Sequence, residues 1–333
     1  MRFTMLQQQK IRRFFPRWFT IGVCLSVLLP ASFAGAAEAR KVEKETSIHI
    51  NKNVIVVSGR MSLGLINGKS NENVYVPEFQ HKLSELNWDI SGVYMLGLGG
   101  SVAPLSWLKL NGDVWFKLNK GDGSMRDYDW LFLGEQYTLY SRSDNLDVTR
   151  GIKVDVNSEL TFYEYLKSRF FGVLGFKYDT WKWTAYGGVF DYFGFTGTFD
   201  EVPGITYEQD FYAPYLGLGF SSSLSQTPIT FSGRVIYSPY VWGDDKDQHH
   251  MRNLVFEEDF DSGTMFGVDV AGAYNFTDHF SVLLSYQYQK YQEMKGGTTI
   301  TDLTTGEVIK ITGDAAGMDN YTSMLSLTAE YSF

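Results

Sequence analysis

Two short stretches of the chain carry acidic residues at a spacing that could support hydrolysis. The first, SMRDYDW (124–130), places Asp127 and Asp129 two positions apart. The second, GDDKDQHH (243–250), places Asp247 and His249 at the same spacing. In a β-strand, residues i and i+2 project from one face, so the members of each pair would lie side by side. The sequence therefore predicts an aspartate couple and an Asp–His dyad.

These pairs suggest a hydrolase that activates water. A carboxylate that binds an imidazole fixes the ring tautomer and raises the basicity of the ring, so His249 could take a proton from water. A second carboxylate pair across a groove could hold the same water and share a proton. Such a site needs no metal, serine or cysteine. The alternative is that both clusters are solvated acidic loops or bind divalent cations. A metal site at His249 and His250 is disfavoured, because strand neighbours point in opposite directions.

The first 36 residues fit a secretory signal peptide. A basic segment without acidic residues is followed by the apolar run FTIGVCLSVLLPASFAGA, which ends in small residues. We expect the mature chain to be residues 37–333, and an uncleaved membrane anchor is the alternative. The single cysteine, Cys24, would leave with the signal, so the mature chain would have no disulfide and no thiol chemistry.

The mature chain is predicted to be acidic. Five of the 29 basic residues and none of the 38 acidic ones lie in the signal segment, which leaves a net charge of −14 for residues 37–333. This charge argues against nucleic acid as a partner and favours cationic partners.

Composition and alternation predict an all-β outer-membrane barrel. Aromatic residues make up 16% of the chain, and such side chains line the two membrane interfaces of exported barrels. In IKVDVNSELTF (152–162), apolar residues alternate with polar ones, as expected for strands with one face toward lipid and one toward the lumen. A soluble sandwich would alternate in the same way. The chain ends in MLSLTAEYSF, whose terminal Phe333 resembles the assembly signal of bacterial outer-membrane barrels. These features imply a Gram-negative source.

The connections predict ten antiparallel transmembrane strands, because four short turns alternate with five long loops. Short turns face the periplasm in such barrels and long loops face outward. Several strands exceed the roughly 9–11 residues that cross a bilayer, so the barrel should extend beyond the membrane. The predicted strands are 54–66, 88–103, 106–119, 148–163, 169–187, 206–223, 228–241, 260–275, 279–293 and 317–333.

In this context the sequence resembles the omptins, ten-stranded outer-membrane proteases. The resemblance is carried by MSLGLINGKSNENVYV (61–76), MRDYDW (125–130), DDKDQHH (244–250) and GMDNYTSMLSLTAEYSF (317–333), in the family's order. It implies that Asp127 and Asp129 are the family's aspartate couple, and that Asp247 and His249 are its Asp–His dyad. It also implies attack by an activated water on peptide bonds flanked by basic residues.

The resemblance further implies which residues contact substrate. Glu72 and Asp245 match the acidic pocket for a basic side chain, and carboxylates are the groups that Lys or Arg would need there. Met125 and Ile205 match the apolar positions of the next subsite. The alternatives are that Glu72 is a solvated loop charge and that Ile205 faces lipid.

One departure concerns lipopolysaccharide, which omptins require as an activator and hold partly with arginines on the outer wall. Thr180 and Asp210 stand where two of these arginines would fall. A threonine cannot bind phosphate by charge, and an aspartate would repel it. Lys177, Lys182 and Arg169 are near in sequence without reproducing the pattern. Either other groups bind the lipid or its requirement differs.

The sequence thus predicts a monomeric endopeptidase of the Gram-negative outer membrane, with a catalytic groove at the outer end. Its substrates would be basic peptides and host proteins, its lipid partner would be the surrounding outer membrane, and it would need no metal. The alternative function is a non-catalytic adhesin or invasin whose acidic loops bind basic host surfaces. A lipid hydrolase is disfavoured because no serine is placed by motif beside His249. A narrow porin is disfavoured because side chains largely fill so small a lumen.

Overall fold

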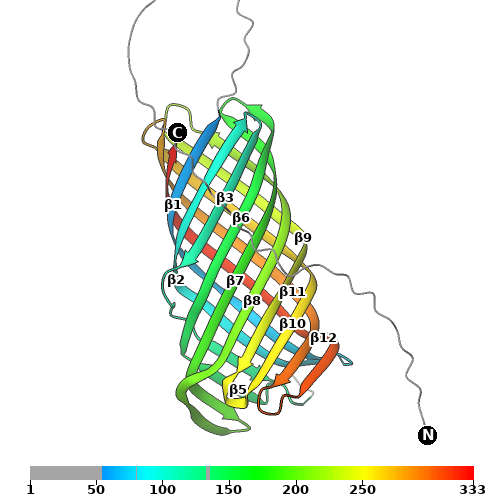
Figure 1. Ribbon diagram of the computed structural model, residues 1–333. Helices are drawn as coiled ribbons and strands as arrows, with labels where there is room; N and C mark the ends of the chain where they lie inside the picture. Colours follow the sequence, from blue (N-terminus) through cyan, green and yellow to red (C-terminus); the bar gives the residue numbers. More distant parts are fainter. Residues whose placement is uncertain (1–54, 80, 133–135) are drawn as a thin grey trace, which may run out of the picture. The chain divides into compact units, whose positions relative to one another are not determined.

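A computed structural model describes residues 55–79, 81–132 and 136–333, which are almost entirely β-strand (Figure 1). The predicted signal peptide, residues 1–36, lies outside the described residues. In the described part of the chain, no helix is long and apolar enough to cross a membrane. The strands are β1 (Val56–Val76), β2 (His81–Leu105), β3 (Leu108–Lys117), β4 (Met125–Asp129), β5 (Leu139–Ser143), β6 (Asn145–Tyr165), β7 (Ser168–Tyr192), β8 (Phe195–Ser223), β9 (Ile229–His249), β10 (Leu254–Asn275), β11 (Phe280–Asp302) and β12 (Val308–Ser332).

The strands form a closed antiparallel barrel, because the first strand pairs with the last. β1 pairs with β12 on one side and with β2 on the other. The ring continues from β2 through β3 and β6 to β7 at one end, whereas β4 and β5 take these two places at the other end. In the described part of the chain, ten strands therefore surround the interior at the end that holds β3 and β6. Ten also surround it at the end that holds β4 and β5, as predicted. Closure leaves no unpaired edge, which an apolar surrounding requires.

The two ends of the barrel differ in their connections. At one end, here called the short-turn end, lie the turns 106–107, 166–167, 224–228 and 276–279, together with the C-terminus (Figure 1). This agrees with the four predicted turns. The other end, here called the site end, carries the β1–β2, β7–β8, β9–β10 and β11–β12 hairpins and the strands β4 and β5.

The segments between the predicted strands were predicted to be loops at 66–88, 188–206, 241–259 and 293–316. This prediction was wrong, because strands continue through most of each range. β1 extends to Val76, and β9 extends to His249 before the 3-10 turn η1 (His250–Arg252). The prediction ended each strand where apolar alternation stops. A polar hairpin in water can still pair its backbone, so the ladder outlasts the apolar pattern.

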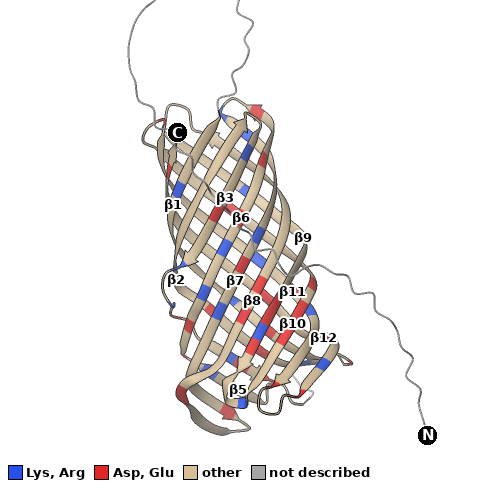
Figure 2. Cartoon of the chain, viewed as in Figure 1, with Lys and Arg blue, Asp and Glu red and all other residues tan. Residues whose placement is uncertain are grey.

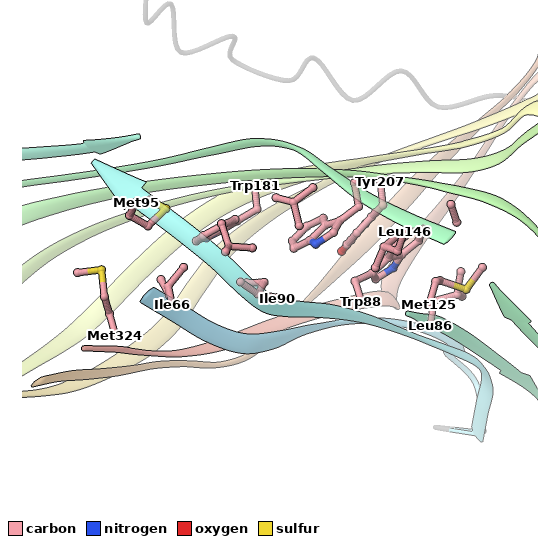
Figure 3. Packing of buried hydrophobic residues seen from close by; sticks show 14 residues of the cluster. Ile66, Leu86, Trp88, Ile90, Met95, Met125, Leu146, Trp181, Tyr207 and Met324 are labelled. Atoms are coloured by element: carbon pink, nitrogen blue, oxygen red, sulfur yellow. The ribbon is translucent and has the colours of Figure 1, made fainter. Parts of the chain in front are cut away.

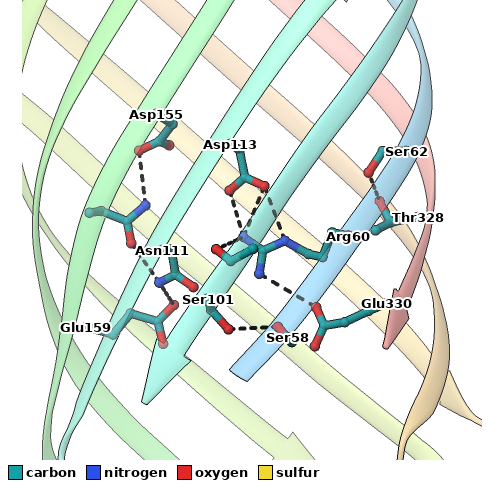
Figure 4. Close-up of polar contacts among 12 residues, drawn as sticks. Ser58, Arg60, Ser62, Ser101, Asn111, Asp113, Asp155, Glu159, Thr328 and Glu330 are labelled. Carbon is teal, nitrogen blue, oxygen red and sulfur yellow. Dashed lines mark hydrogen bonds and ion pairs between the residues drawn. The ribbon is translucent and has the colours of Figure 1, made fainter. Parts of the chain in front are cut away.

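The outward face of the short-turn half is apolar, and the inward face is charged. Leucines such as Leu63, Leu218 and Leu327 are exposed on the outside. Inside, Arg60 binds Asp113 at 2.9 Å and lies 3.6 Å from Glu330 (Figure 4). This is the lipid-out, polar-in arrangement predicted for a transmembrane barrel.

Farther along the same strands, the inward residues become apolar. On β7, Lys177 and Asp179 are followed by the inward pair Trp181 and Trp183, and both tryptophans are fully buried. These belong to a cluster that fills the interior below the site end (Figure 3). Beyond this cluster acidic side chains return, and Figure 2 shows Asp and Glu gathered on β8 to β10 toward the site end.

Candidate active site

The Asp–His dyad lies at the site end of β9. The strand runs without a break from Ile229 to His249, so Asp247 and His249 share its inward face as predicted. His249 Nε2 lies 2.6 Å from Asp247 Oδ2, and Asp247 is only 1% exposed. The ring of His249 also packs against Phe256 of β10, with 5.4 Å between centroids. These contacts fix the ring and leave Nδ1 as the nitrogen that can accept a proton.

Asp247 makes His249 a stronger base. Burial opposes a charged imidazole, but the adjacent carboxylate of Asp247 overcomes this cost and raises the pKa of His249. The negative charge of Asp127 acts in the same direction, whereas Arg252 of η1 opposes it. His249 therefore responds to charges from across the groove as well as to its strand neighbour.

The aspartate couple lies on the short strand β4, with Asp127 and Asp129 on one face as predicted. Ser84 of β2 pairs with Asp129 in the sheet, and its hydroxyl donates to Asp127 Oδ1 at 3.3 Å. Ser84 was missed from the sequence because its role depends on the register between β2 and β4. In ring order, β5, β7 and β8 separate β4 from β9, so the couple and the dyad face each other across the interior.

The couple is suited to carry a shared proton. Burial and the neighbouring Asp129 raise the pKa of Asp127 to about 7, while the positive charge of His249 pulls it down. Burial also raises the pKa of Asp129, which the Ser84 hydroxyl and Arg252 partly offset. Two carboxyl groups this close titrate as a unit, so near neutral pH the couple can either donate or accept one proton.

A cluster of buried carboxyl groups, here called the pocket, lies next to the dyad. Glu72 of β1 and Asp245 of β9 are 8% and 5% exposed and both belong to this cluster, and that they bind a basic side chain stays a prediction. Glu258 of β10 is a third carboxylate that the sequence did not predict, since it fell in a predicted loop. It pairs with Asp245 across the β9–β10 ladder, and the two carboxyl groups are hydrogen-bonded. The run FEEDFDSG (256–263) was the available signal for an acidic position here.

Aromatic side chains hold the pocket carboxylates in place. Trp88 Nε1 donates to Glu72 Oε2 at 3.3 Å, and the Tyr207 hydroxyl donates to Asp245 Oδ2 at 2.8 Å. The Trp88 and Tyr207 rings stack with centroids 5.3 Å apart (Figure 3). Trp183 also stacks on Tyr207. The fully buried Gln209 donates to the Tyr207 hydroxyl at 2.8 Å. These contacts hold the carboxyl groups of Glu72 and Asp245 in fixed positions.

The pocket carboxyl groups have no cationic partner among the described residues. Glu72, Asp245 and Glu258 form no ion pair there, although Glu72 lies within hydrogen-bonding reach of Asp247. Burial and neighbouring carboxylates raise the pKa of Glu72 and Asp245 well above the usual range, and burial raises that of Glu258. Within residues 55–79, 81–132 and 136–333, no His, Asp and Glu group has an arrangement that could hold a metal ion.

The two predicted apolar subsite residues lie near the couple and the dyad. Met125 begins β4 and is buried beside Leu86 and Trp88 (Figure 3). Ile205 of β8 pairs with His249 in the ladder and packs against the same cluster while staying partly accessible. That they contact substrate stays a prediction.

The outer wall holds a basic residue that the sequence analysis overlooked. Arg150 Nε donates to the Thr180 hydroxyl at 3.0 Å, its guanidinium binds Glu208, and it lies 3.7 Å from Asp210 Oδ2. Lys182 also binds Glu208, at 3.2 Å.

Two of the basic residues noted beside this wall instead belong to the lumen. Lys177 binds Asp155 at 2.9 Å, and Arg169 lies 3.5 Å from Glu159. Lys177, Asp155, Arg169 and Glu159 all line the interior cavity of the short-turn half. Only Lys182 among the three predicted neighbours reaches the outer wall.

Comparison with known proteins gives consistent matches. The model of the Omptin family matches residues 53–333. A plasminogen activator of Yersinia pestis is 32% identical over 276 residues, which cover 82% of this chain and 88% of the relative. The outer membrane protease OmpP of Escherichia coli K12 is 27% identical over 287 residues, covering 83% and 90%. The crystal structure of the outer membrane protease OmpT from Escherichia coli superposes with a TM-score of 0.79 at 22% identity, covering 84% of this chain and 97% of that one.

Proposed function

The chain belongs to the omptin family of outer-membrane proteases, and from this membership we propose that it is an endopeptidase that cleaves beside Lys or Arg by means of activated water. The observation that carries the proposal is the 2.6 Å contact between Asp247 and His249, facing a half-buried aspartate couple. The acidic pocket adjoining the dyad supports the choice of a basic side chain.

In the proposed reaction, a water molecule lies between the couple and His249. His249 Nδ1 takes a proton from this water while Nε2–H donates to Asp247, which stabilises the imidazolium. The water oxygen forms a bond to the carbonyl carbon of the substrate. Asp127 and Asp129 orient the water, and the shared proton of the couple stabilises the oxygen that becomes negative. Breakage of the C–N bond follows when the imidazolium returns its proton to the leaving amine.

The substrate side chain would enter the pocket of Glu72 and Asp245. A lysine or arginine supplies the positive charge that these carboxylates lack, and charge-assisted hydrogen bonds to it are about twice as strong as neutral ones. Met125 and Ile205 would contact the residue on the other side of the scissile bond. The groove would face outward, so substrates would be peptides and proteins outside the cell, host proteins among them.

We also propose that lipopolysaccharide is less important here than the family resemblance implies. Arg150, the basic residue beside Thr180 and Asp210, is already bound to Glu208. A guanidinium that pairs with carboxylates of its own chain has less capacity for a lipid phosphate. In this proposal, the carboxylates of this wall pair with Arg150 in the place that a lipid phosphate would otherwise take.

One experiment tests both proposals. The mature chain, refolded with and without lipopolysaccharide, is incubated with a peptide library, and the cleavage sites are mapped by mass spectrometry. Cleavage next to Lys or Arg in both conditions is the expected result. Cleavage only with the lipid would refute the second proposal alone. Absence of cleavage in both conditions would contradict the endopeptidase and favour an adhesin.

A further inference from the structure

Glu258 is, with Glu72 and Asp245, one of three buried carboxyl groups at the site end that form no ion pair among the described residues. It is 9% exposed, and Thr298 of β11 donates to its Oε1 at 2.5 Å. Its neighbour Glu257 points to the other side of β10, where it binds the exposed Lys246 at 2.8 Å. Adjacent glutamates on one strand thus occupy opposite environments.

Glu258 and Asp245 form a carboxyl pair. They are directly opposite each other in the β9–β10 ladder and hydrogen-bonded through their side chains. Two adjacent carboxylates in a buried site repel each other strongly when both are ionised, so this pair favours one shared proton. Asp245 Oδ2 accepts from the Tyr207 hydroxyl, whereas the buried Asp245 Oδ1 has no hydrogen-bond partner, and the fully buried Gln209 Oε1 also lacks one. The pocket therefore has acceptor capacity that the protein does not use.

We propose that Glu258 is a specificity-determining carboxylate of the pocket, and that a basic side chain enters in exchange for the proton held between Asp245 and Glu258. This inference rests on the proposed function. The exchange balances charge, because one cation enters and one proton leaves to water through the groove. Asp245 and Glu258 both become carboxylates, and the ammonium or guanidinium of the substrate then lies between them and Glu72.

The surroundings of Glu258 favour such an exchange. Its titratable neighbours are Asp245 and Asp247 of β9 and Glu72 of β1, all acidic, and Tyr207 of β8, which is hydrogen-bonded to Asp245. Glu257 on its own strand faces outward. No described Lys or Arg forms an ion pair with Glu258, so the substrate supplies the first cation that this carboxylate meets. A neutral side chain could not displace the proton, which gives the pocket discrimination.

Proton exchange links affinity to pH. A group that loses a proton when a ligand binds makes that ligand bind more tightly as pH rises, up to the pKa that the group has in the free protein. Burial raises the pKa of Glu258, and burial with Glu258 beside it raises that of Asp245. The KM for a basic peptide should therefore fall as pH rises above the ordinary carboxyl range near 4.

The test is calorimetric titration of the refolded mature chain with n-butylguanidine, a probe that carries the cation but no peptide bond. Titrations at one pH in two buffers of different ionisation enthalpy give the number of protons released. We expect the wild type to release about one proton more than Glu258→Gln. The matched control Glu257→Gln should release as many protons as the wild type.

A second variant keeps the test valid if Glu258→Gln does not fold. Thr298→Val keeps the carboxyl group but removes a hydrogen bond that favours its ionised form. The pair should then hold its proton more firmly, and the pH at which half of the proton is released should shift upward. Equal proton release by the wild type and Glu258→Gln, or no shift in Thr298→Val, would overturn the exchange.

Failure of this inference and failure of the proposed function give different results. If n-butylguanidine binds and basic peptides are cleaved, but no proton is released, only the exchange is refuted. If the probe does not bind and no basic peptide is cleaved, the proposed specificity is wrong as well.

Discussion

The charged groups of the lumen and those of the pocket differ in whether the protein supplies their partners. In the short-turn half, Asp155 binds Lys177 at 2.9 Å and Arg234 at 2.8 Å, and Lys153 binds Asp179 at 3.0 Å. In the pocket, the described residues give Glu72 and Asp245 no cation at all. Both sets are buried, so burial alone does not separate a structural charge from a functional one. The two sets differ in their counter-charges, because the lumen carboxylates have cationic partners and those of the pocket have none among the described residues.

This difference indicates what each set is for. A buried ion pair that is complete holds its neighbours in register, and loss of one partner is costly. A buried carboxylate without a partner is costly in the free protein, and it is retained where a ligand completes it. The complete ion pairs of the lumen therefore support the barrel, whereas the unpaired carboxyl groups of the pocket are those that we propose a substrate completes.

The largest expected effect is on catalysis. His249→Ala should lower kcat for a basic peptide by roughly 10²–10⁴-fold, the scale of a lost general base. His250→Ala should retain activity, because that ring points away and contacts the Thr206 hydroxyl at 2.8 Å. Steady-state kinetics on both refolded variants decides. If His250→Ala were the inactive one, the assignment of the dyad would be wrong.

The next effect should fall on stability and should come from the lumen. Asp155→Ala leaves Lys177 and Arg234 without their shared carboxylate, which should cost about 3–5 kcal/mol of unfolding free energy. Urea unfolding of the barrel in lipid vesicles, followed by tryptophan fluorescence, measures this. An unchanged unfolding midpoint would show that the network is dispensable.

Urea unfolding of a pocket variant should show the opposite change, which is a gain in unfolding free energy. Asp245→Asn keeps a hydrogen-bond acceptor for Tyr207 but removes a carboxyl group whose pKa is raised by burial and by Glu258. A carboxyl group with a raised pKa destabilises the folded state above its ordinary pKa, so at pH 8 the variant should be more stable, by about 1 kcal/mol. Cleavage of basic peptides should fall. If Asp245→Asn were less stable than the wild type at pH 8, the proposed difference between the charges of the lumen and those of the pocket would be wrong.

A smaller effect, on the pKa of His249, tests whether the couple and the dyad face each other. Burial lowers and Asp247 raises the pKa of His249, and the ionised Asp127 adds to the increase. Asp127→Asn removes a negative charge that stabilises the imidazolium, so the pKa of His249 should fall. An NMR titration of the ring protons measures it directly, independent of activity. An unchanged pKa of His249 would mean that the charge of Asp127 does not reach the dyad.

The smallest effect is expected from an exposed pair. Lys246 and Glu257 bind at 2.8 Å with about half of each side chain accessible. Exposed pairs contribute about 0–1 kcal/mol, so Lys246→Ala should barely change the unfolding free energy or kcat. If Lys246→Ala lowered the unfolding free energy as much as Asp155→Ala does, the contribution of an ion pair to stability would not depend on whether it lies in the lumen or on the surface.

Much of the fold and half of the site follow from local patterns in the sequence. The ring depends on period-2 alternation and on the order of short turns. The couple and the dyad depend on an i, i+2 spacing within one strand. Each of these features is contained in a few consecutive residues, and the structure brings Asp247 and His249 together at the predicted spacing.

The remainder depends on register between strands that are far apart in the chain. Ser84 reaches Asp127 because β2 and β4 pair in one register, and Glu258 enters the pocket because it lies opposite Asp245. The apolar alternation ended before these residues, so their hairpins read as loops. Arg150 lies within a predicted strand, but its contact with Thr180 depends on the bulge between β6 and β7, which local alternation does not reveal.

The two halves of the candidate site are attached to the barrel in different ways. Asp247 and His249 lie on a strand that continues unbroken from the short-turn end, whereas Asp127 and Asp129 lie on a five-residue strand that begins after β3 has ended. Exchange of β4 and β5 between related barrels should therefore replace the strands that carry the couple, while β9 and its histidine stay as they are.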